Sequence, residues 1–306
     1  MYDLVIIGAG PAGMTAAVYA ARKGIEAVLL SDNVGGQVLW TLGVENYMGY
    51  QFIEGAELIE KFEDQVRRSA SAVECKIGDK VKKVRQEAED YEVETEKGGR
   101  FRGKTVLLST GKRPRQLGVP GEKELVGRGI SYCATCDGPL FAGQKVAVIG
   151  GGNSALSAAE EMLKIAEHVY VVSLTELTGD QVLIDKVTGA GNVSVLTEHE
   201  VTDVVGEGPV REIGIRNNKN KEEKRLEVAG VMVEIGLTPN SEPVSGLAAL
   251  NEWGEVEVSC SNETGMPGLF AAGDVTNVPE KQIVIAAGEG AKATLRAHRY
   301  LQRLRA

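Results

Sequence analysis

The chain has 306 residues, enough for two domains of ordinary size. Its hydrophobic fraction of 43% and charged fraction of 25% are typical of a soluble globular protein, and no apolar run reaches the roughly 18 residues that span a bilayer, so we expect no membrane partner. The formal charge of −9, from 34 basic and 43 acidic residues, argues against a nucleic-acid partner, because phosphate binding requires clustered Lys and Arg.

The first predicted element is a buried strand that leads through a glycine-rich turn into a helix. The segment YDLVII precedes Gly8-Ala9-Gly10-Pro11-Ala12-Gly13, and MTAAVYAARKG follows. The first glycine permits a tight turn, the second lets a pyrophosphate approach the backbone, and the third lets helix and strand pack closely. A second strand, EAVLLSD, ends at Asp32, near where an acidic side chain would meet a ribose hydroxyl. This pattern predicts a dinucleotide site.

A further buried strand, VLLSTGKRP, covers residues 106–114 and includes Thr110 and Gly111. Small residues at such a strand end allow close contact between the backbone and a ligand. The position therefore supports a cofactor at the first glycine-rich turn.

Cys133 and Cys136 follow in the stretch SYCATCDGPLF. No basic segment precedes the apolar N-terminal residues, so we expect no secretion signal and a cytoplasmic, reducing location. In that compartment a cysteine pair is more often catalytic or metal-binding than structural. On a helical turn the two side chains share a face and can form a disulfide. Asp137 adjoins the pair and could exchange the proton that dithiol chemistry requires.

Zinc is the first alternative use of this pair, and the rest of the chain disfavours it. A structural zinc site needs four Cys or His ligands, usually as two spaced pairs. The other cysteines, Cys75 and Cys260, are isolated and read as buried thiols, and the three histidines are scattered. We expect no metal.

The glycine-rich pattern then recurs. KVAVI leads into a second turn, a helix LSAAEEMLKIAEH follows, and the strand VYVVS ends at Ser173. The turn is a GxGxxA variant that also holds a pyrophosphate, and its residues are Gly150, Gly151, Gly152, Asn153, Ser154 and Ala155. A simple dehydrogenase needs one dinucleotide site, whereas a flavoprotein reduced by a nicotinamide needs two. The pair between the two turns is therefore interpreted as an electron carrier, from nicotinamide through flavin to an external disulfide.

The last predicted strand ends at Gly273 and Asp274, and a long helix follows Pro279. Asp274 could accept a hydrogen bond from a ribityl hydroxyl. The helix begins near Lys281, Gln282 and Ile283, so its positive dipole end and free N–H groups would face whatever lies beyond Asp274. This arrangement would stabilise a reduced, anionic flavin.

Together, the motifs GAGPAG, STG, CATCDG, GGGNSA and GLFAAGDV followed by KQI resemble the low-molecular-weight thioredoxin reductases over essentially the whole chain. The second half is similar to the reductase portion of the alkyl hydroperoxide reductase flavoprotein. That flavoprotein carries an N-terminal thioredoxin-like module, whereas this chain starts at the first strand of the flavin domain. The resemblance therefore implies that a separate thioredoxin-like or glutaredoxin-like protein accepts the electrons, and it implies a homodimer.

The resemblance also implies an α/β architecture of two Rossmann-like dinucleotide-binding domains, one inserted in the other. The FAD domain would comprise residues 1–115 and 244–306, and the domain carrying the cysteine pair would comprise residues 116–243. The Pro/Gly-rich stretches GKRPRQLGVPGE and GLTPNSEPVSG would connect them, and rotation of the inserted domain would alternately reduce and expose the disulfide. By motif match, FAD would also contact Gly35, Gly36, Gln37 and Asn46.

One segment departs from the family. NADPH-specific members carry an arginine-rich run after the second strand of the nucleotide domain, but residues 171–178 here contain no arginine, and none follows until Arg211. A 2′-phosphate needs such a cationic partner. We therefore expect NADH as the donor, with Ser173 or Glu176 near the free 2′-hydroxyl, and NADPH as less favoured. Two alternatives stay open: a non-pyridine donor such as reduced ferredoxin or another flavin, and a flavin-based redox sensor.

Overall fold

The computed structural model describes residues 1–41, 43–68 and 73–305 of the chain. A seven-stranded sheet with the order β3-β2-β1-β6-β5-β4 forms the larger part, and β17 pairs with β6. The pairs β1–β2, β1–β6, β2–β3 and β6–β17 are parallel, whereas β4–β5 and β5–β6 are antiparallel. The strands are β1 (Tyr2–Ala9), β2 (Ala27–Val34), β3 (Val73–Ile77), β4 (Val81–Glu87), β5 (Asp90–Thr95), β6 (Arg100–Leu108) and β17 (Leu269–Ala271).

Three helices accompany this sheet: α1 (Pro11–Arg22), α2 (Gly55–Arg67) and α7 (Ile283–Arg305), with the short 3-10 turn η1 (Gly36–Trp40) after β2. Helices α1 and α7 are close neighbours, because a Cβ added to Gly290 would lie 2.0 Å from the carbonyl oxygen of Ala12. The C-terminal segment is thereby held against the first glycine-rich turn. Strand β1 is buried on both faces, as central parallel strands are, and Leu4, Val5 and Ile6 have no exposed surface.

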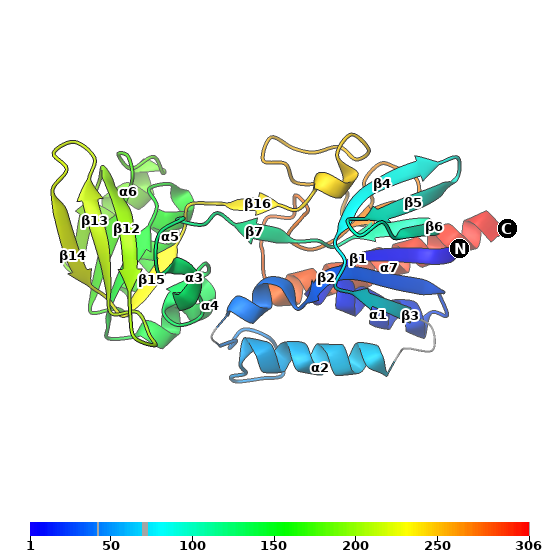
Figure 1. The fold of residues 1–306 in the computed structure, drawn as a ribbon, viewed down its shortest axis with the longest axis horizontal. Coiled ribbons are helices and arrows are strands. Elements are labelled where there is room, and N and C mark those ends of the chain that lie inside the picture. Colours follow the sequence, from blue (N-terminus) through cyan, green and yellow to red (C-terminus); the bar gives the residue numbers. More distant parts are fainter. Residues whose placement is uncertain (42, 69–72, 306) are drawn as a thin grey trace.

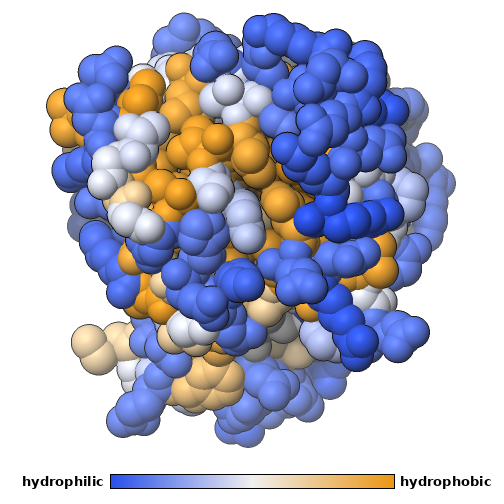
Figure 2. All heavy atoms as spheres, turned by 90° about the vertical axis from the view of Figure 1, so that its left-hand side faces the viewer, coloured by the Kyte–Doolittle hydropathy of each residue, from blue (hydrophilic) through white to orange (hydrophobic). Residues whose placement is uncertain are grey.

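A second, wholly parallel sheet has the order β11-β10-β9-β15-β8. An antiparallel sheet with the order β12-β13-β14 lies at the left-hand end of the molecule in Figure 1. The strands are β8 (Ile130–Ser131), β9 (Lys145–Ile149), β10 (His168–Val172), β11 (Val193–Leu196), β12 (His199–Val205), β13 (Glu212–Asn217), β14 (Glu223–Glu227) and β15 (Gly230–Val233). The helices are α3 (Glu122–Leu125), α4 (Ala134–Asp137), α5 (Asn153–Leu163) and α6 (Gln181–Thr188), with the 3-10 turn η2 (Gly138–Phe141). Figure 2 shows this end of the molecule, with apolar side chains gathered near its centre and hydrophilic ones around them.

Two short antiparallel strands connect the two parts of the fold (Figure 1): β7 (Lys112–Pro114) and β16 (Leu237–Pro239), followed by the turn η3 (Glu242–Val244). They pair Lys112 with Pro239 and Arg113 with Thr238. We propose the domain division 1–115 with 244–306, and 116–243. The hydrophobic clusters support it, because two are built from residues before 109 and after 243, and two from residues between 116 and 236.

None of the helices in the described part of the chain is both long and apolar enough to cross a membrane.

Candidate active site

In the first glycine-rich turn, Gly8 and Gly13 leave no room for a side chain, whereas Gly10 faces open space. A Cβ on Gly8, which has φ +102°, would lie 2.4 Å from the carbonyl oxygen of Ser109, and one on Gly13 would lie 1.8 Å from that of Gly8. A Cβ on Gly10 would meet no atom within 4 Å. Gly10 is the N-cap of α1, and Pro11 occupies the first turn. The open side of this turn therefore offers a helix start to an anion, as a pyrophosphate requires.

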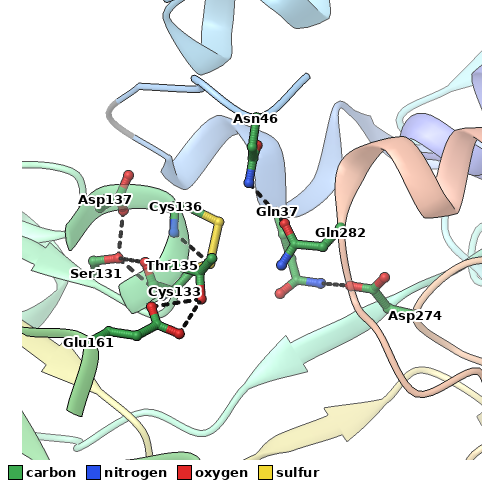
Figure 3. Close-up of a disulfide and its surroundings, with 10 residues drawn as sticks. All are labelled: Gln37, Asn46, Ser131, Cys133, Thr135, Cys136, Asp137, Glu161, Asp274 and Gln282. Atoms are coloured by element: carbon green, nitrogen blue, oxygen red, sulfur yellow. Dashed lines mark hydrogen bonds between the residues drawn. A yellow bond between two sulfur atoms is a disulfide. The ribbon is translucent and has the colours of Figure 1, made fainter. Parts of the chain in front are cut away.

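Two hydrogen-bonded pairs join distant segments beside this turn (Figure 3). Gln37 Nε2 donates to Asp274 Oδ2 at 3.0 Å, and Asn46 Nδ2 donates to Gln282 Oε1 at 3.1 Å. Gln37 belongs to η1, Asp274 follows β17, and Gln282 precedes α7. The structure thus brings together four of the residues that the sequence predicts to bind FAD.

Asp274 sits in a charged setting. Burial raises the pKa of its carboxyl, and the nearby Lys281 and Lys112 ammonium groups partly offset that rise. Burial and the like charge of Lys112 lower the pKa of Lys281. Lys281 and Lys112 both pair with Glu255, at 3.3 and 2.5 Å. Lys281, predicted as a cofactor residue, is thus tied to Glu255 and also donates to the carbonyl oxygen of Thr276 at 2.6 Å.

The remaining predicted residues of the first site lie around the same turn. Asp32 is exposed and accepts a hydrogen bond from the backbone N–H of Asn33 at 3.0 Å. Thr110 donates from Oγ1 to the carbonyl oxygen of Asn240 at 2.7 Å. Ala12 is buried, and Gly35, Gly36, Gly111 and Gly273 all have positive φ values between +57° and +98°. Ile283 begins α7 and packs against the adjoining core.

The cysteine pair forms a disulfide, with its Cα atoms 5.3 Å apart. Cys133 is the N-cap of the four-residue helix α4, and its Sγ accepts a hydrogen bond from the N–H of Cys136 at 3.2 Å. Asp137 ends the helix, is 1% exposed, and lies 2.5 Å from the Oγ of Ser131. Thr135, between the cysteines, donates to Glu161 at 3.1 Å (Figure 3). The pair thus occupies a helix start, which stabilises a thiolate, next to a buried carboxyl group.

The second glycine-rich turn has the same build. A Cβ on Gly150, which has φ +140°, would lie 2.4 Å from the carbonyl oxygen of Glu234, and Gly152 is the N-cap of α5. Ala155 is buried against Gly150. The side chain of Asn153 accepts from the N–H of Asp180 at 2.6 Å. Asn153 therefore connects the turn to the loop after β10. Its position at the start of α5 is the one observation that favours a contact with a ligand.

Ser173, predicted as the last residue of its strand, directly follows β10, which ends at Val172, and is 2% exposed. A Cβ on Gly151 would lie 2.2 Å from its Oγ, so the hydroxyl is next to the turn. Glu176 is exposed in the following loop, which returns to the turn through a 2.8 Å hydrogen bond from the N–H of Thr178 to the carbonyl oxygen of Gly151.

The expectation that Cys75 and Cys260 are buried is wrong, because both are exposed. Cys75 lies in the edge strand β3, whose burial pattern shows one buried residue followed by four exposed ones. An edge strand has a neighbouring strand on one side only, so its side chains are less covered than those of a central strand. An isolated cysteine in the sequence does not reveal that its strand lies at the edge.

Sequence reasoning also missed four polar residues. Ser131 contacts Asp137, and Glu234 contacts Ser154. Asn240 joins the connecting strands, with its Nδ2 donating to the carbonyl oxygen of Thr110 at 2.9 Å. Glu289, 5% exposed on α7, accepts from the N–H of Gly273 at 2.8 Å. In the sequence, Glu289 could have been recognised only as an acidic residue within the run IAAGEGAKA, which otherwise consists mostly of small residues.

A disulfide next to one of two glycine-rich dinucleotide-binding turns is the arrangement of a disulfide oxidoreductase that uses two dinucleotides. The chain belongs to the pyridine nucleotide-disulphide oxidoreductase family, whose profile matches residues 2–290. Membership supports FAD and a pyridine nucleotide as cofactors, and the open glycines and polar pairs described above fit them.

Named relatives cover this chain almost completely. One subunit of the alkyl hydroperoxide reductase of Pseudomonas aeruginosa is 43% identical over 305 residues, which are 99% of this chain and 58% of that protein. NADH dehydrogenase of Bacillus subtilis is 41% identical over 304 residues, 99% of this chain and 59% of that protein. The chain therefore spans less than two thirds of the length of these curated relatives.

Solved thioredoxin reductases match over their whole length. The enzyme of Streptococcus pyogenes is 35% identical, with a TM-score of 0.93 and 99% of each chain covered. That of Lactococcus lactis in the FR conformation is 32% identical, with a TM-score of 0.69 and coverage of 99% of this chain and 100% of that one.

Proposed function

We propose that the protein is an FAD-dependent protein-disulfide reductase that passes electrons from NADH to the Cys133–Cys136 disulfide and then to a thioredoxin-like or glutaredoxin-like protein. The observation that carries the proposal is the disulfide at the start of α4, with Asp137 buried beside it and a glycine-rich turn on either side in the sequence. Similarity to thioredoxin reductases supports the acceptor class.

The residues at the first turn would hold FAD. Gly10 and the start of α1 would receive the pyrophosphate, and Gln37, Asp274, Asn46 and Gln282 provide polar side chains beside it. When bound, FAD would supply the two-electron carrier between the nicotinamide and the disulfide. The start of α7 at Ile283 would contribute free N–H groups to the same site.

The cysteines and Asp137 then carry out disulfide exchange. Reduction of the pair adds two electrons and two protons and breaks the sulfur–sulfur bond. The thiolate of one cysteine attacks a sulfur of the partner protein and forms a mixed disulfide, and the second thiol resolves it and restores the Cys133–Cys136 bond. The partner leaves as a dithiol, so electrons balance. Asp137 would hold the proton that moves to and from the sulfurs.

The loop after β10 supports NADH over NADPH. Ser173 is a neutral neighbour of Gly151, and Glu176 adds negative charge. Residues 173–180 offer no arginine to a 2′-phosphate. A relative named NADH dehydrogenase, 41% identical, agrees with this preference.

We also infer rotation of the inserted domain about β7 and β16. Two thioredoxin reductases of similar identity and coverage superpose with very different TM-scores, 0.93 and 0.69, which supports a fold with more than one domain arrangement. A homodimer and a cytoplasmic location complete the proposal; both rest on the resemblance and the composition.

Stopped-flow reduction of the FAD-loaded protein tests the proposal. NADH should bleach the flavin at least about tenfold more efficiently than NADPH, by kcat/KM, because no arginine compensates for desolvation of the extra phosphate beside Glu176. Thioredoxin reduction should then follow. A preference for NADPH would overturn the donor assignment, and bleaching by reduced ferredoxin alone would replace it with the non-pyridine alternative.

A further inference from the structure

Glu234 lies where the second glycine-rich turn and the cysteine pair meet. Its Oε2 accepts a hydrogen bond from Ser154 Oγ at 2.5 Å, and the backbone N–H of Ala134, next to Cys133, also donates to its carboxylate. Ser154 is exposed in the first turn of α5, and Ala134 begins α4. One half-buried carboxylate thus touches both functional elements of the inserted domain.

The sheet order places Glu234 beside the point where the strand order reverses. Ligands of open α/β sheets bind outside the carboxyl ends of the strands where the strand order reverses. Strand β9 continues through α5 to β10 on one side, while β15 pairs with its other side. Glu234 directly follows β15, and Ser154 follows β9. Both side chains therefore flank the reversal point.

The positions of Ser173 and Glu234 would set the direction of a dinucleotide bound at this turn. Ser173, directly after β10, is next to Gly151 on the side where the adenosine ribose is expected. With a pyrophosphate at the start of α5, the nicotinamide half would extend toward β15, where Glu234 lies. That half carries ribose hydroxyls and a carboxamide, all hydrogen-bond donors.

Glu234 retains acceptor capacity for such donors. A carboxylate offers about four lone-pair positions, and Ser154 and Ala134 account for two. Among the described residues, no Lys, Arg or His forms an ion pair with it. Burial raises the pKa of this carboxyl, and the charge of Glu161 adds to the rise. A hydrogen-bond donor of the ligand would offset part of the free-energy cost of keeping the Glu234 carboxylate ionised in this half-buried position.

We propose that Glu234 is a nucleotide-binding residue that accepts hydrogen bonds from the nicotinamide–ribose half of the dinucleotide and so places it beside the Cys133–Cys136 helix. The inference rests on the proposed function, because it needs a nicotinamide nucleotide at the second turn. It adds a specificity residue on the β15 side of the crevice, opposite the adenosine side.

Calorimetric binding of NAD⁺ and of ADP to the FAD-loaded protein tests this role without turnover. ADP shares the adenosine and pyrophosphate and lacks the nicotinamide half. In Glu234→Gln, which keeps the size of the side chain, the Kd for NAD⁺ should rise about tenfold, since a charge-assisted bond becomes a neutral one, while the Kd for ADP stays within about twofold. The matched control Glu160→Gln, a glutamate of the same helix α5 that pairs with Lys186 and does not contact the turn, should leave both constants unchanged.

Each other result overturns the inference. Unchanged NAD⁺ affinity in Glu234→Gln would remove the contact while leaving the proposed function intact. Parallel weakening of NAD⁺ and ADP would show that Glu234 only supports the turn, and tighter ADP binding would show that its charge repels the pyrophosphate. If the wild-type protein bound neither nucleotide, the donor assignment and this inference would fall together.

Discussion

Ser131 Oγ lies 2.5 Å from Asp137 Oδ2, and each residue is only 1% exposed. The same hydroxyl accepts a hydrogen bond from the N–H of Cys133 at 3.0 Å. Ser131 belongs to β8, the edge strand of the second sheet, whereas Asp137 ends α4. The serine therefore fixes the carboxyl group relative to the first cysteine, so the proposed proton exchange with the pair would depend on a residue outside the CATCD motif.

Asp137→Asn should lower the rate of thioredoxin reduction about a hundredfold or more, in the range lost when a general acid–base is removed. Reduction of a thioredoxin-like substrate under steady-state conditions measures this loss. Ser131→Ala should cause a smaller loss, because the carboxylate stays present and only its position is freed. FAD content should be normal in both variants. Equal rates for Asp137→Asn and wild type would assign the proton to another group.

Replacing either Cys133 or Cys136 with Ser should abolish disulfide reduction while the flavin spectrum stays intact, since neither side chain contributes to the first glycine-rich turn. The matched controls are Cys75→Ser and Cys260→Ser, which remove exposed thiols without a disulfide partner in the structure. They should retain full activity. Turnover by Cys133→Ser at the parent rate would rule out the pair as the relay.

The two glycines of the first turn should respond differently to alanine. In Gly10→Ala the new methyl group enters open space, so the melting temperature of the FAD-free protein should barely change, whereas FAD affinity should fall because the methyl group occupies the pyrophosphate approach. In Gly13→Ala the Cβ would lie 1.8 Å from the carbonyl oxygen of Gly8, so the fold itself should be destabilised. Thermal melts with and without FAD separate the two effects. Unaltered FAD affinity in Gly10→Ala would place the cofactor elsewhere.

The sequence predicts features that depend on neighbouring residues better than contacts between distant segments. Spacing and local pattern predict both turns and the cysteine helix, because these features depend on neighbours within a few residues. The two connecting strands pair residues far apart in the sequence, such as Lys112 and Pro239, and only the family resemblance implied them. The contacts of Ser131, Glu234, Asn240 and Glu289 depend on strands and helices that are distant in sequence and meet only in the folded sheet. The exposure of Cys75 likewise depends on β3 being an edge strand, which no local pattern reveals.

Glu255 should make stability depend on pH. Burial opposes its charge, but hydrogen bonds from Lys112 and Asn251, together with the positive charges of Lys281 and Lys112, outweigh burial and lower its pKa below the ordinary value of 4.5. A lowered pKa stabilises the fold above the ordinary value, and this contribution is lost as the pH falls through the folded-state pKa. Glu255→Gln should therefore cost about 2 kcal/mol at pH 7, the size of a hydrogen bond to a charged group.

Denaturant unfolding of wild type and Glu255→Gln across pH 3–7 measures this difference. The difference in the free energy of unfolding between the two proteins should become smaller as the pH falls below about 4.5, where the wild-type carboxyl also becomes neutral. Glu257→Gln changes an exposed glutamate nearby in sequence and should show a much smaller gap. A gap that persists at low pH would mean that the glutamate acts through its shape alone.

Nucleotide preference should shift when a cation is placed in the loop after β10. Leu174 is 62% exposed, directly follows Ser173, and lies in the loop that returns to Gly151 through the N–H of Thr178. An arginine there provides the bidentate partner that a 2′-phosphate requires and that this loop lacks. In Leu174→Arg the ratio of kcat/KM for NADPH to that for NADH should rise at least about tenfold, and the shift should shrink in high salt because exposed charges are screened. Leu304→Arg adds the same charge at the far end of α7 and should leave the ratio unchanged. An equal shift in both variants would trace the effect to net charge, whereas no shift in either would show that the adenosine ribose does not face this loop.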